Sequence, residues 1–252
     1  MPGTAEPIRV VVAGAGGRMG SETVRAVAGE KDMIVAREVH RGDDLATALR
    51  DAHADVLVDF TVPESVMANL RVALAAHIVP IVGTTGLSPE NLAEIRSLCE
   101  ENGVGALVAP NFAIGAVLLM QFAQTAAKYM PDVEIIEMHH ERKLDAPSGT
   151  AVKTAALIAE VRDAAQARGD LPGAFETVTG ARGGRAEGSI PVHSIRLPGF
   201  VASQEVIFGG PGQRLSLRHD SIDRASFMPG VVLAVRRAAS LSGLVYGLEN
   251  LL

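Results

Sequence analysis

The chain has 252 residues with a formal net charge of −6, and 48% of its residues are hydrophobic. This balance predicts a folded globular protein. The net negative charge, the absence of Trp and the presence of only two Tyr argue against nucleic acid as the main partner. No uncharged apolar run approaches the roughly 18 residues of a membrane span. Cys99 has no second thiol to pair with and no nucleophile pattern around it, so we expect a structural thiol, and a cytoplasmic protein without a secretory signal in its short polar N-terminus.

Strand and helix patterns alternate through the first part of the chain. β-branched and apolar runs predict strands at residues 8–14, 33–38, 55–61, 78–85 and 104–112. Helical spacing predicts helices at residues 18–29, 45–52, 65–77 and 88–102. Strict alternation is typical of α/β proteins with a parallel sheet and right-handed crossovers, so we predict a Rossmann-like, doubly wound domain.

The pattern changes after Asn111. Helices are expected at 113–130 and 149–169, and strands at 133–140, 190–199, 201–209 and 213–221. These elements predict a second α+β domain with a mixed sheet, and the Gly- and Arg-rich residues 181–189 predict a mobile loop and a candidate lid. A last helix at 226–243 is expected to return to the first domain. The predicted domains are therefore 1–112, completed by 222–252, and 113–221.

A glycine-rich turn follows the first strand and precedes a helix, which favours a dinucleotide site over a turn without a ligand. Met19 takes the place of the third glycine of G-x-G-x-x-G, and Gly20 follows it. The candidate residues of this turn are Gly14, Ala15, Gly16, Gly17, Arg18 and Met19.

The second strand ends near Glu38, which is too early to bind a ribose, so the tip is His40 and Arg41. A cationic tip without a carboxylate favours NADPH, with NADH still usable; the alternative is that Arg41 begins a solvated loop. The ends of the fourth and fifth strands offer small residues for a nicotinamide and ribose, although ordinary turns are the alternative. These residues are Gly83, Thr84 and Thr85, and Ala109, Pro110, Asn111 and Phe112.

The stretch EMHHERKLDAPSGTA, residues 137–151, combines groups that suit catalysis. In a strand His139 and His140 point to opposite faces, Lys143 follows, and Ser148, Gly149 and Thr150 begin a helix whose N–H groups could bind a carboxylate. Taken singly, each has a structural explanation as a filler, a solvated lysine or a cap. No zinc site is expected, because no Cys or second carboxylate stands at ligand spacing, and no G-x-S-x-G hydrolase motif exists.

The run from His139 to Ala151 resembles the signature of the 4-hydroxy-tetrahydrodipicolinate (dihydrodipicolinate) reductase family. The resemblance extends to GAGGRMG, VDFT at 58–61, GTTG, APNF, IPVHSIRLPG and RHDSIDRASFMPGV, and the second half is most similar to actinobacterial members. It implies reduction of a cyclic dicarboxylate by NADH or NADPH with loss of water, in a homotetramer whose domains close on a hinge.

The resemblance also implies residue roles. His139 is the acid–base residue and Lys143 the proton donor, while His140, Gly149 and Thr150 bind substrate. Since His40 stands where many members have an acid, the nucleotide preference is left open. Two alternatives remain: an NADPH-binding regulator without catalysis, which does not need the His-His-Lys motif, and a related homoserine or diaminopimelate dehydrogenase.

Overall fold

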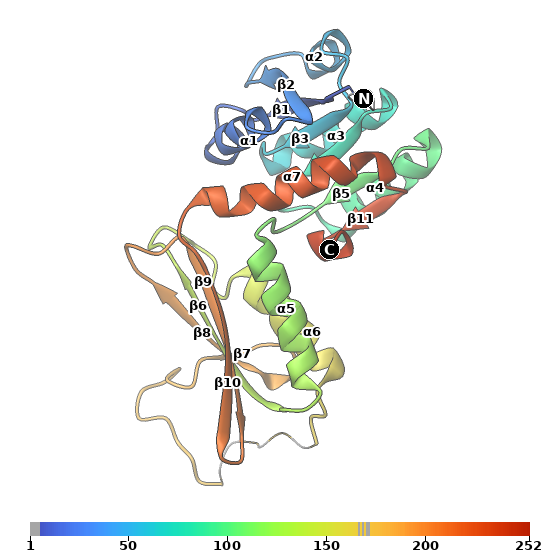
Figure 1. The fold of residues 1–252 in the computed structure, drawn as a ribbon. Coiled ribbons are helices and arrows are strands. Elements are labelled where there is room, and N and C mark those ends of the chain that lie inside the picture. The colour runs from blue at the N-terminus through green and yellow to red at the C-terminus, as the bar shows by residue number, and fades with distance from the viewer. Residues whose placement is uncertain (1–5, 166, 168, 170–171) are drawn as a thin grey trace. The chain divides into compact units, whose positions relative to one another are not determined.

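The computed structural model describes residues 6–165, 167, 169 and 172–252. The N-terminal residues 1–5, and residues 166 and 168 of the helix expected over 149–169, lie outside the described residues. The chain forms two compact units, Met1–Ile114 with Arg224–Leu252 (unit 1) and Gly115–Asp223 (unit 2). Figure 1 shows both.

Unit 1 is built on a six-stranded sheet in which every pairing is parallel, with the order β11-β5-β4-β3-β1-β2. This confirms the α/β class. Its strands are β1 (Ile8–Ala13), β2 (Met33–Val39), β3 (Val56–Asp59), β4 (Val79–Val82), β5 (Ala106–Val108) and β11 (Leu244–Tyr246).

Helices cover both faces of this sheet. Val11, Leu57, Val82 and Val108 all lie on one face, which packs with helix residues such as Leu49, Leu70 and Cys99. The last helix packs against α1, β1 and β4, all within unit 1. The helices are α1 (Arg18–Ala28), α2 (Leu45–Asp51), α3 (Pro63–Ala75), α4 (Pro89–Asn102) and α7 (Met228–Arg237).

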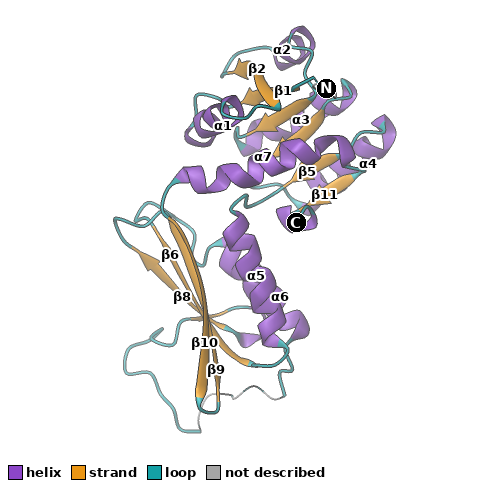
Figure 2. Cartoon of the chain, viewed as in Figure 1, coloured by secondary structure: helices purple, strands orange, loops and turns teal. Residues whose placement is uncertain are grey.

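Unit 2 has a mixed five-stranded sheet, β10-β9-β6-β8-β7, in which only β6 and β8 run parallel among the pairings of the described residues. Figure 2 shows α5 and α6 along one face of it. Phe208, Ile135 and Ile158 are fully buried in the core between helices and sheet. The elements are α5 (Ile114–Ala127), β6 (Asp132–His139), α6 (Gly149–Val161), β7 (Gly184–Arg185), β8 (Pro191–Arg196), β9 (Ala202–Gly210) and β10 (Gln213–Ser221). Short 3-10 turns are η1 (Glu187–Ser189), η2 (Arg224–Phe227), η3 (Ala238–Ser240) and η4 (Leu248–Asn250).

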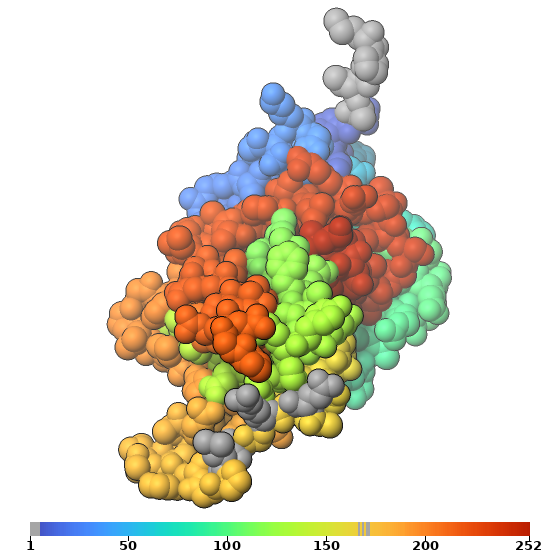
Figure 3. All heavy atoms as spheres, turned by 60° about the horizontal axis from the view of Figure 1, so that its bottom comes forward, coloured from blue at the N-terminus to red at the C-terminus, as the bar shows by residue number. Residues whose placement is uncertain are grey.

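The structure differs from the predicted elements at three places. The strand β11 was not predicted; it adds to the sheet edge by pairing Leu244 with Ala106. The helix α6 ends at Val161 because Arg162 has extended backbone angles, so the prediction that it continues to 169 is wrong. Residues 184–185, expected in a loop, form the edge strand β7 against β8. Figure 3 shows the gold-coloured segment of unit 2 at the molecular surface.

None of the helices in the described part of the chain is long and apolar enough to cross a membrane.

The thiol of Cys99 is predicted to be inert in the folded protein. It is 2% exposed, and burial together with Glu100 raises its pKa to about 11. Because the thiolate is the reactive form, a thiol reagent at pH 8 should label the single cysteine only after denaturant is added. Rapid stoichiometric labelling of the native protein, followed by mass spectrometry, would contradict this.

Candidate active site

The turn between β1 and α1 has the geometry of a phosphate cradle. Gly14 adopts a φ of +77°, and a Cβ there would lie 2.5 Å from the carbonyl oxygen of Phe60. The N–H of Gly17 donates to the carbonyl of Gly14 at 2.9 Å, and Gly17 caps α1 without a side-chain hydrogen bond. The exposed start of α1 therefore presents backbone N–H groups and the positive end of the helix dipole.

Gly20 explains the shifted glycine spacing. A Cβ at Gly20 would lie 2.0 Å from the carbonyl oxygen of Gly14, so only glycine lets the first turn of α1 approach the loop this closely. The neighbouring Met19 is partly buried and makes a helix contact instead, its carbonyl accepting from the Thr23 hydroxyl at 3.0 Å. Close helix packing is the usual role of the third glycine in such loops.

A cavity of about 620 Å³ opens beside this loop. It joins the glycine loop to the tip of β2 and the end of β3, and its size and open glycine wall fit part of a dinucleotide. Ala15 is buried under the loop, whereas Arg18 is exposed at its edge. The lining residues include Gly14, Gly16, Gly17, His40, Arg41, Asp43, Phe60, Thr61 and Asn69.

The tip of β2 carries carboxylates as well as cations. The Asp43 carboxylate accepts from the N–H of His40 at 2.8 Å, and Glu38 lies 3.8 Å from Nε2 of His40. The prediction of a tip without a carboxylate is therefore wrong, because the turn after His40 brings Asp43 back. Arg41 is exposed and lines the cavity beside them.

Asp59 connects the ends of β3 and β4. Its carboxylate is 1% exposed and accepts from the Thr61 N–H at 2.9 Å, the Thr61 hydroxyl at 2.7 Å, Asn69 Nδ2 at 2.7 Å and the Thr84 hydroxyl at 2.8 Å. The Thr84 hydroxyl therefore holds the loop after β4 to the end of β3. The same junction places the ring of Phe60 against Gly83, where a Cβ would meet it at 2.0 Å.

The residues after β4 and β5 follow neighbouring parallel strands, but they do not line the cavity above. Thr85 and Pro110 are exposed, while Ala109 is buried. The carboxamide of Asn111 accepts from the N–H of Ala113 at 2.8 Å. The buried ring of Phe112 meets Phe60 edge-on, with centroids 5.8 Å apart.

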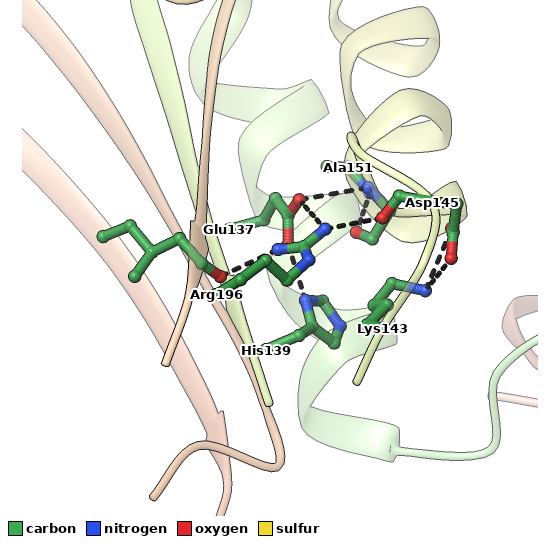
Figure 4. Close-up of polar contacts among 8 residues, drawn as sticks. Glu137, His139, Lys143, Asp145, Ala151 and Arg196 are labelled. Carbon is green, nitrogen blue, oxygen red and sulfur yellow. Dashed lines mark hydrogen bonds and ion pairs between the residues drawn. The ribbon is translucent and has the colours of Figure 1, made fainter. Parts of the chain in front are cut away.

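In unit 2, one face of the strand β6 carries core residues first and candidate site residues toward its end. Val133 and Ile135 pack in the core beneath the helices, and the alternation of the strand puts Glu137 and His139 on that same face. β6 ends at His139, so His140 begins the following turn. Figure 4 shows the resulting group.

The Glu137 carboxylate is fully buried and is surrounded by hydrogen-bond donors. Arg196 donates to both oxygens, at 2.7 and 2.9 Å, Nδ1 of His139 lies at 2.5 Å, and the Ser148 N–H donates at 3.2 Å. Burial by itself raises the pKa of Glu137, but the hydrogen bonds from His139 and Arg196 outweigh it and lower the pKa to about 2.

Lys143 is paired with a different acid. Its Nζ donates to both oxygens of Asp145 at 2.8 and 2.9 Å, and this bond lowers the pKa of Asp145. The loop is tied back to the sheet because Arg196 also donates to the carbonyl of Asp145 at 2.7 Å. A backbone bond from Lys143 N to the His140 carbonyl, 3.1 Å long, shapes the turn between them.

The start of α6 uses some of its donors internally. The Ser148 N–H donates to Glu137, and the Ser148 hydroxyl accepts from the Ala151 N–H at 3.3 Å. Beside Gly149 the space is open, since a Cβ there meets nothing within 4 Å among the described residues. An anion can therefore approach the helix start at Gly149 and its partly buried neighbour Thr150.

Sequence reasoning missed Asp59, Glu137, Asp145 and Arg196 as parts of these sites. A signal existed for Glu137, because the alternation of β6 puts a carboxylate on the core face, where it needs partners. Nothing local identifies Arg196, which is 59 residues away. Across the described residues, no group of three or more His, Cys, Asp or Glu could hold a metal ion.

Both halves of the chain match one enzyme family. Residues 8–112 match the family described as dihydrodipicolinate reductase, N-terminus, and residues 115–252 match dihydrodipicolinate reductase, C-terminus. The chain belongs to the dihydrodipicolinate reductase family. A 4-hydroxy-tetrahydrodipicolinate reductase of Desulfitobacterium hafniense is 52% identical, with 97% of this chain and 98% of that protein covered. One of Listeria innocua is 49% identical, with 97% and 100% covered.

Solved structures agree with this assignment. A dipicolinate-bound dihydrodipicolinate reductase from Paenisporosarcina sp. TG-14 has a TM-score of 0.87 at 43% identity and covers 98% of this chain and 100% of its own. A DAP dehydrogenase of C. glutamicum has a TM-score of 0.57 at 14% identity, covering 97% and 94%, and shares the fold alone.

The buried Glu137 predicts a specific acid dependence of stability. Its pKa is about 2 in the fold against an ordinary 4.5, so its stabilisation is complete above pH 4.5 and is lost as the pH falls toward 2. Glu137→Gln should lower the free energy of unfolding at pH 7 by roughly 3–5 kcal/mol, because Arg196 loses its buried partner. In urea titrations the gap to wild type should close between pH 4.5 and 2.

The exposed Glu141 provides a matched control. Glu141→Gln should stay close to wild type at every pH, since an exposed carboxylate contributes little. A gap between wild type and Glu137→Gln that stays constant into acid would contradict the prediction.

Proposed function

We propose that this chain catalyses the NAD(P)H-dependent reduction of 4-hydroxy-tetrahydrodipicolinate to tetrahydrodipicolinate, with loss of water, in lysine and diaminopimelate biosynthesis. The observation that carries the proposal is the grouping in unit 2 of an imidazole held by a buried carboxylate, a paired ammonium and an open helix start, all within residues 137–151. The family membership of the whole chain supports it.

Unit 1 supplies the nucleotide site in this proposal. The N–H groups at the start of α1 bind the pyrophosphate, and Gly14, Gly16 and Gly17 leave room for it. The loops after β4 and β5, held by Asp59 and by the Phe60–Phe112 contact, shape the nicotinamide end. When bound, the reduced nicotinamide supplies the hydride to the conjugated ring. Hydride transfer requires it to reach the substrate during turnover, which is the closure that the resemblance implies.

His139 and Lys143 serve the proton side of the reaction. Negative charge develops on the ring as it is reduced, and an imidazole titrates near neutral pH, which suits a general acid. His139 is 15% exposed in its side chain and Lys143 22% exposed, so both are sheltered but reachable. Lys143 adds a positive charge near the acid and is the second candidate donor.

The start of α6 serves to fix the substrate. A substrate carboxylate accepts hydrogen bonds from the N–H groups at Gly149 and Thr150, and His140 lies in the preceding turn as a further polar contact. Ser148 acts as the cap that shapes this turn. Such fixation orients the ring, and orientation can contribute several kcal/mol to lowering a barrier, up to about 7–11 kcal/mol in favourable cases.

We further propose a preference for NADPH with NADH still accepted. The exposed guanidinium of Arg41 at the cavity wall favours a 2′-phosphate. The carboxylates of Asp43 and Glu38 beside His40 weaken this preference and suit the ribose hydroxyls of NADH.

A cytoplasmic homotetramer is part of the proposal. Helices cover one face of the unit 2 sheet, and the other face carries the partly buried Ile136, Ile195 and Ile207. These apolar side chains lie beside the paired groups Glu134 and His193, and a sheet face of this mixed kind supports a contact between copies of the chain.

Replacing either proton donor should abolish most of the turnover. His139→Gln and Lys143→Ala should each lower kcat by about 100-fold or more, as expected for loss of a positioned acid. Turnover is measured by the absorbance of the reduced nicotinamide with 4-hydroxy-tetrahydrodipicolinate. Leu144→Ala is the control from the same loop, since Leu144 is 100% exposed. Near-normal rates in both variants would remove the chemical assignment, and nucleotide binding without any turnover in wild type would favour a regulator.

Replacing Arg41 should weaken the use of NADPH and leave the use of NADH nearly unchanged. Loss of a charge-assisted bond costs about 1.5–3 kcal/mol, so Arg41→Ala should raise the KM for NADPH by roughly 10- to 100-fold and leave that for NADH nearly unchanged. Arg37→Ala, at an exposed position of β2, is the matched control. Equal rises for both nucleotides would show that Arg41 does not bind the 2′-phosphate.

A further inference from the structure

Among the described residues of unit 2, the Glu137 carboxylate is the most buried ionisable group that the proposed reaction does not use. Its side chain is 0% exposed, yet it lies at the site end of β6 and contacts His139 directly. Glu134, three residues earlier on the opposite face, also pairs with a histidine and an arginine, but it is 35% exposed. The contrast makes Glu137 a candidate for more than a stabilising ion pair.

The contact between Glu137 and His139 fixes which ring nitrogen carries a proton. A carboxylate can only accept, and the Arg196 guanidinium on both oxygens keeps Glu137 ionised. The nitrogen 2.5 Å from it, Nδ1 of His139, must therefore be the N–H donor. Nε2 is then the nitrogen that exchanges protons with a ligand.

Arg196 links the Glu137 carboxylate to residues 140–147, the loop that carries Lys143 (the lysine loop). It has one guanidinium nitrogen on Glu137 and the carbonyl of Asp145, at 2.7 Å each, and the Asp145 carboxylate holds Lys143. The Ser148 N–H completes the group from the start of α6. One carboxylate thus connects the imidazole, the lysine loop and the helix start.

We propose that Glu137, held by Arg196, is a positioning residue that keeps a proton on Nδ1 of His139 and so makes Nε2 the nitrogen that delivers a proton to the substrate. In the step, the Nε2–H bond breaks, its electron pair stays on nitrogen, and a C–H bond forms from the electron pair on the reduced ring. Nδ1 keeps its proton throughout, Glu137 stays ionised, and solvent returns a proton to Nε2. This rests on the proposed function of His139.

The charged groups that face His139 come from each neighbouring element. Glu137 lies on its own strand, Arg196 stands at its register position on β8, and Lys143 with Asp145 lies in the following loop. The two acids balance the two permanent cations, so protonation of His139 adds one positive charge to the group. A dicarboxylate substrate favours that added charge.

The test is the tautomer of His139 in the ligand-free protein. It is measured by imidazole ¹⁵N NMR at a pH high enough for the ring to be neutral. His139 is assigned among the seven histidines by its loss in His139→Gln. In wild type we expect a protonated Nδ1 and an unprotonated Nε2. In the double variant Glu137→Leu/Arg196→Leu, which removes both buried charges together, we expect the proton to move predominantly to Nε2, as in free histidine.

Kinetics provide the second measurement. Glu137→Gln and the double variant should lower kcat by about 10- to 100-fold, as for loss of a group that orients a reacting side chain, with the KM for the nucleotide unchanged. Arg196→Lys keeps the charge but not the paired bonds, so it should fall between wild type and Glu137→Gln. Glu134→Gln is the matched control and should leave the His139 tautomer unchanged.

The outcomes separate the two proposals. An Nε2-protonated His139 in wild type, or a His139 that keeps its proton on Nδ1 in the double variant, overturns the positioning role while leaving the reductase assignment intact. Full turnover by His139→Gln overturns both. A purely structural Glu137 would lower thermal stability without moving the tautomer, and that result also rejects the proposal.

Discussion

Two buried carboxylates, one in each unit, organise the loops on which the candidate sites depend. Asp59 is 1% exposed and Glu137 is fully buried, and both lie at the carboxyl end of a strand. A carboxylate loses its hydration on burial, so hydrogen bonds must replace it. Each therefore gathers donors from several segments that are distant in sequence. The loops that supply these donors are the loops that shape the sites.

Asp59 and Glu137 accept hydrogen bonds from different kinds of donor, and this gives the two carboxylates different roles. In the described part of the chain, Asp59 accepts from neutral groups, namely Thr61, Asn69 and Thr84, so its effect is to fix geometry. Glu137 accepts from a guanidinium and from an imidazole that can change its charge. Because Arg196 binds both of its oxygens, the buried acid keeps a charged partner whether or not the His139 ring is protonated.

The sequence predicts what is encoded locally. Helical spacing and β-branched runs are properties of neighbouring residues, so the alternating elements of unit 1 and the histidine-lysine motif could be recognised. The strands β7 and β11 could not, because two or three residues become strands only through pairing with β8 and β5. Arg196 was missed for the same reason, since it meets Glu137 only through the register of β6 and β8.

The fold by itself does not specify the reaction. The DAP dehydrogenase of C. glutamicum and a D-galactose-1-dehydrogenase from Rhizobium etli share this architecture at 14% and 11% identity, with TM-scores of 0.57 and 0.54. A glycine loop after the first strand meets a requirement common to dinucleotide enzymes. What distinguishes one dinucleotide-dependent oxidoreductase from another must then lie where the second substrate is bound. The substrate site proposed for this chain consists of the end of β6, the loop that carries Lys143 and the start of α6. One buried carboxylate holds this strand, loop and helix together within fifteen consecutive residues.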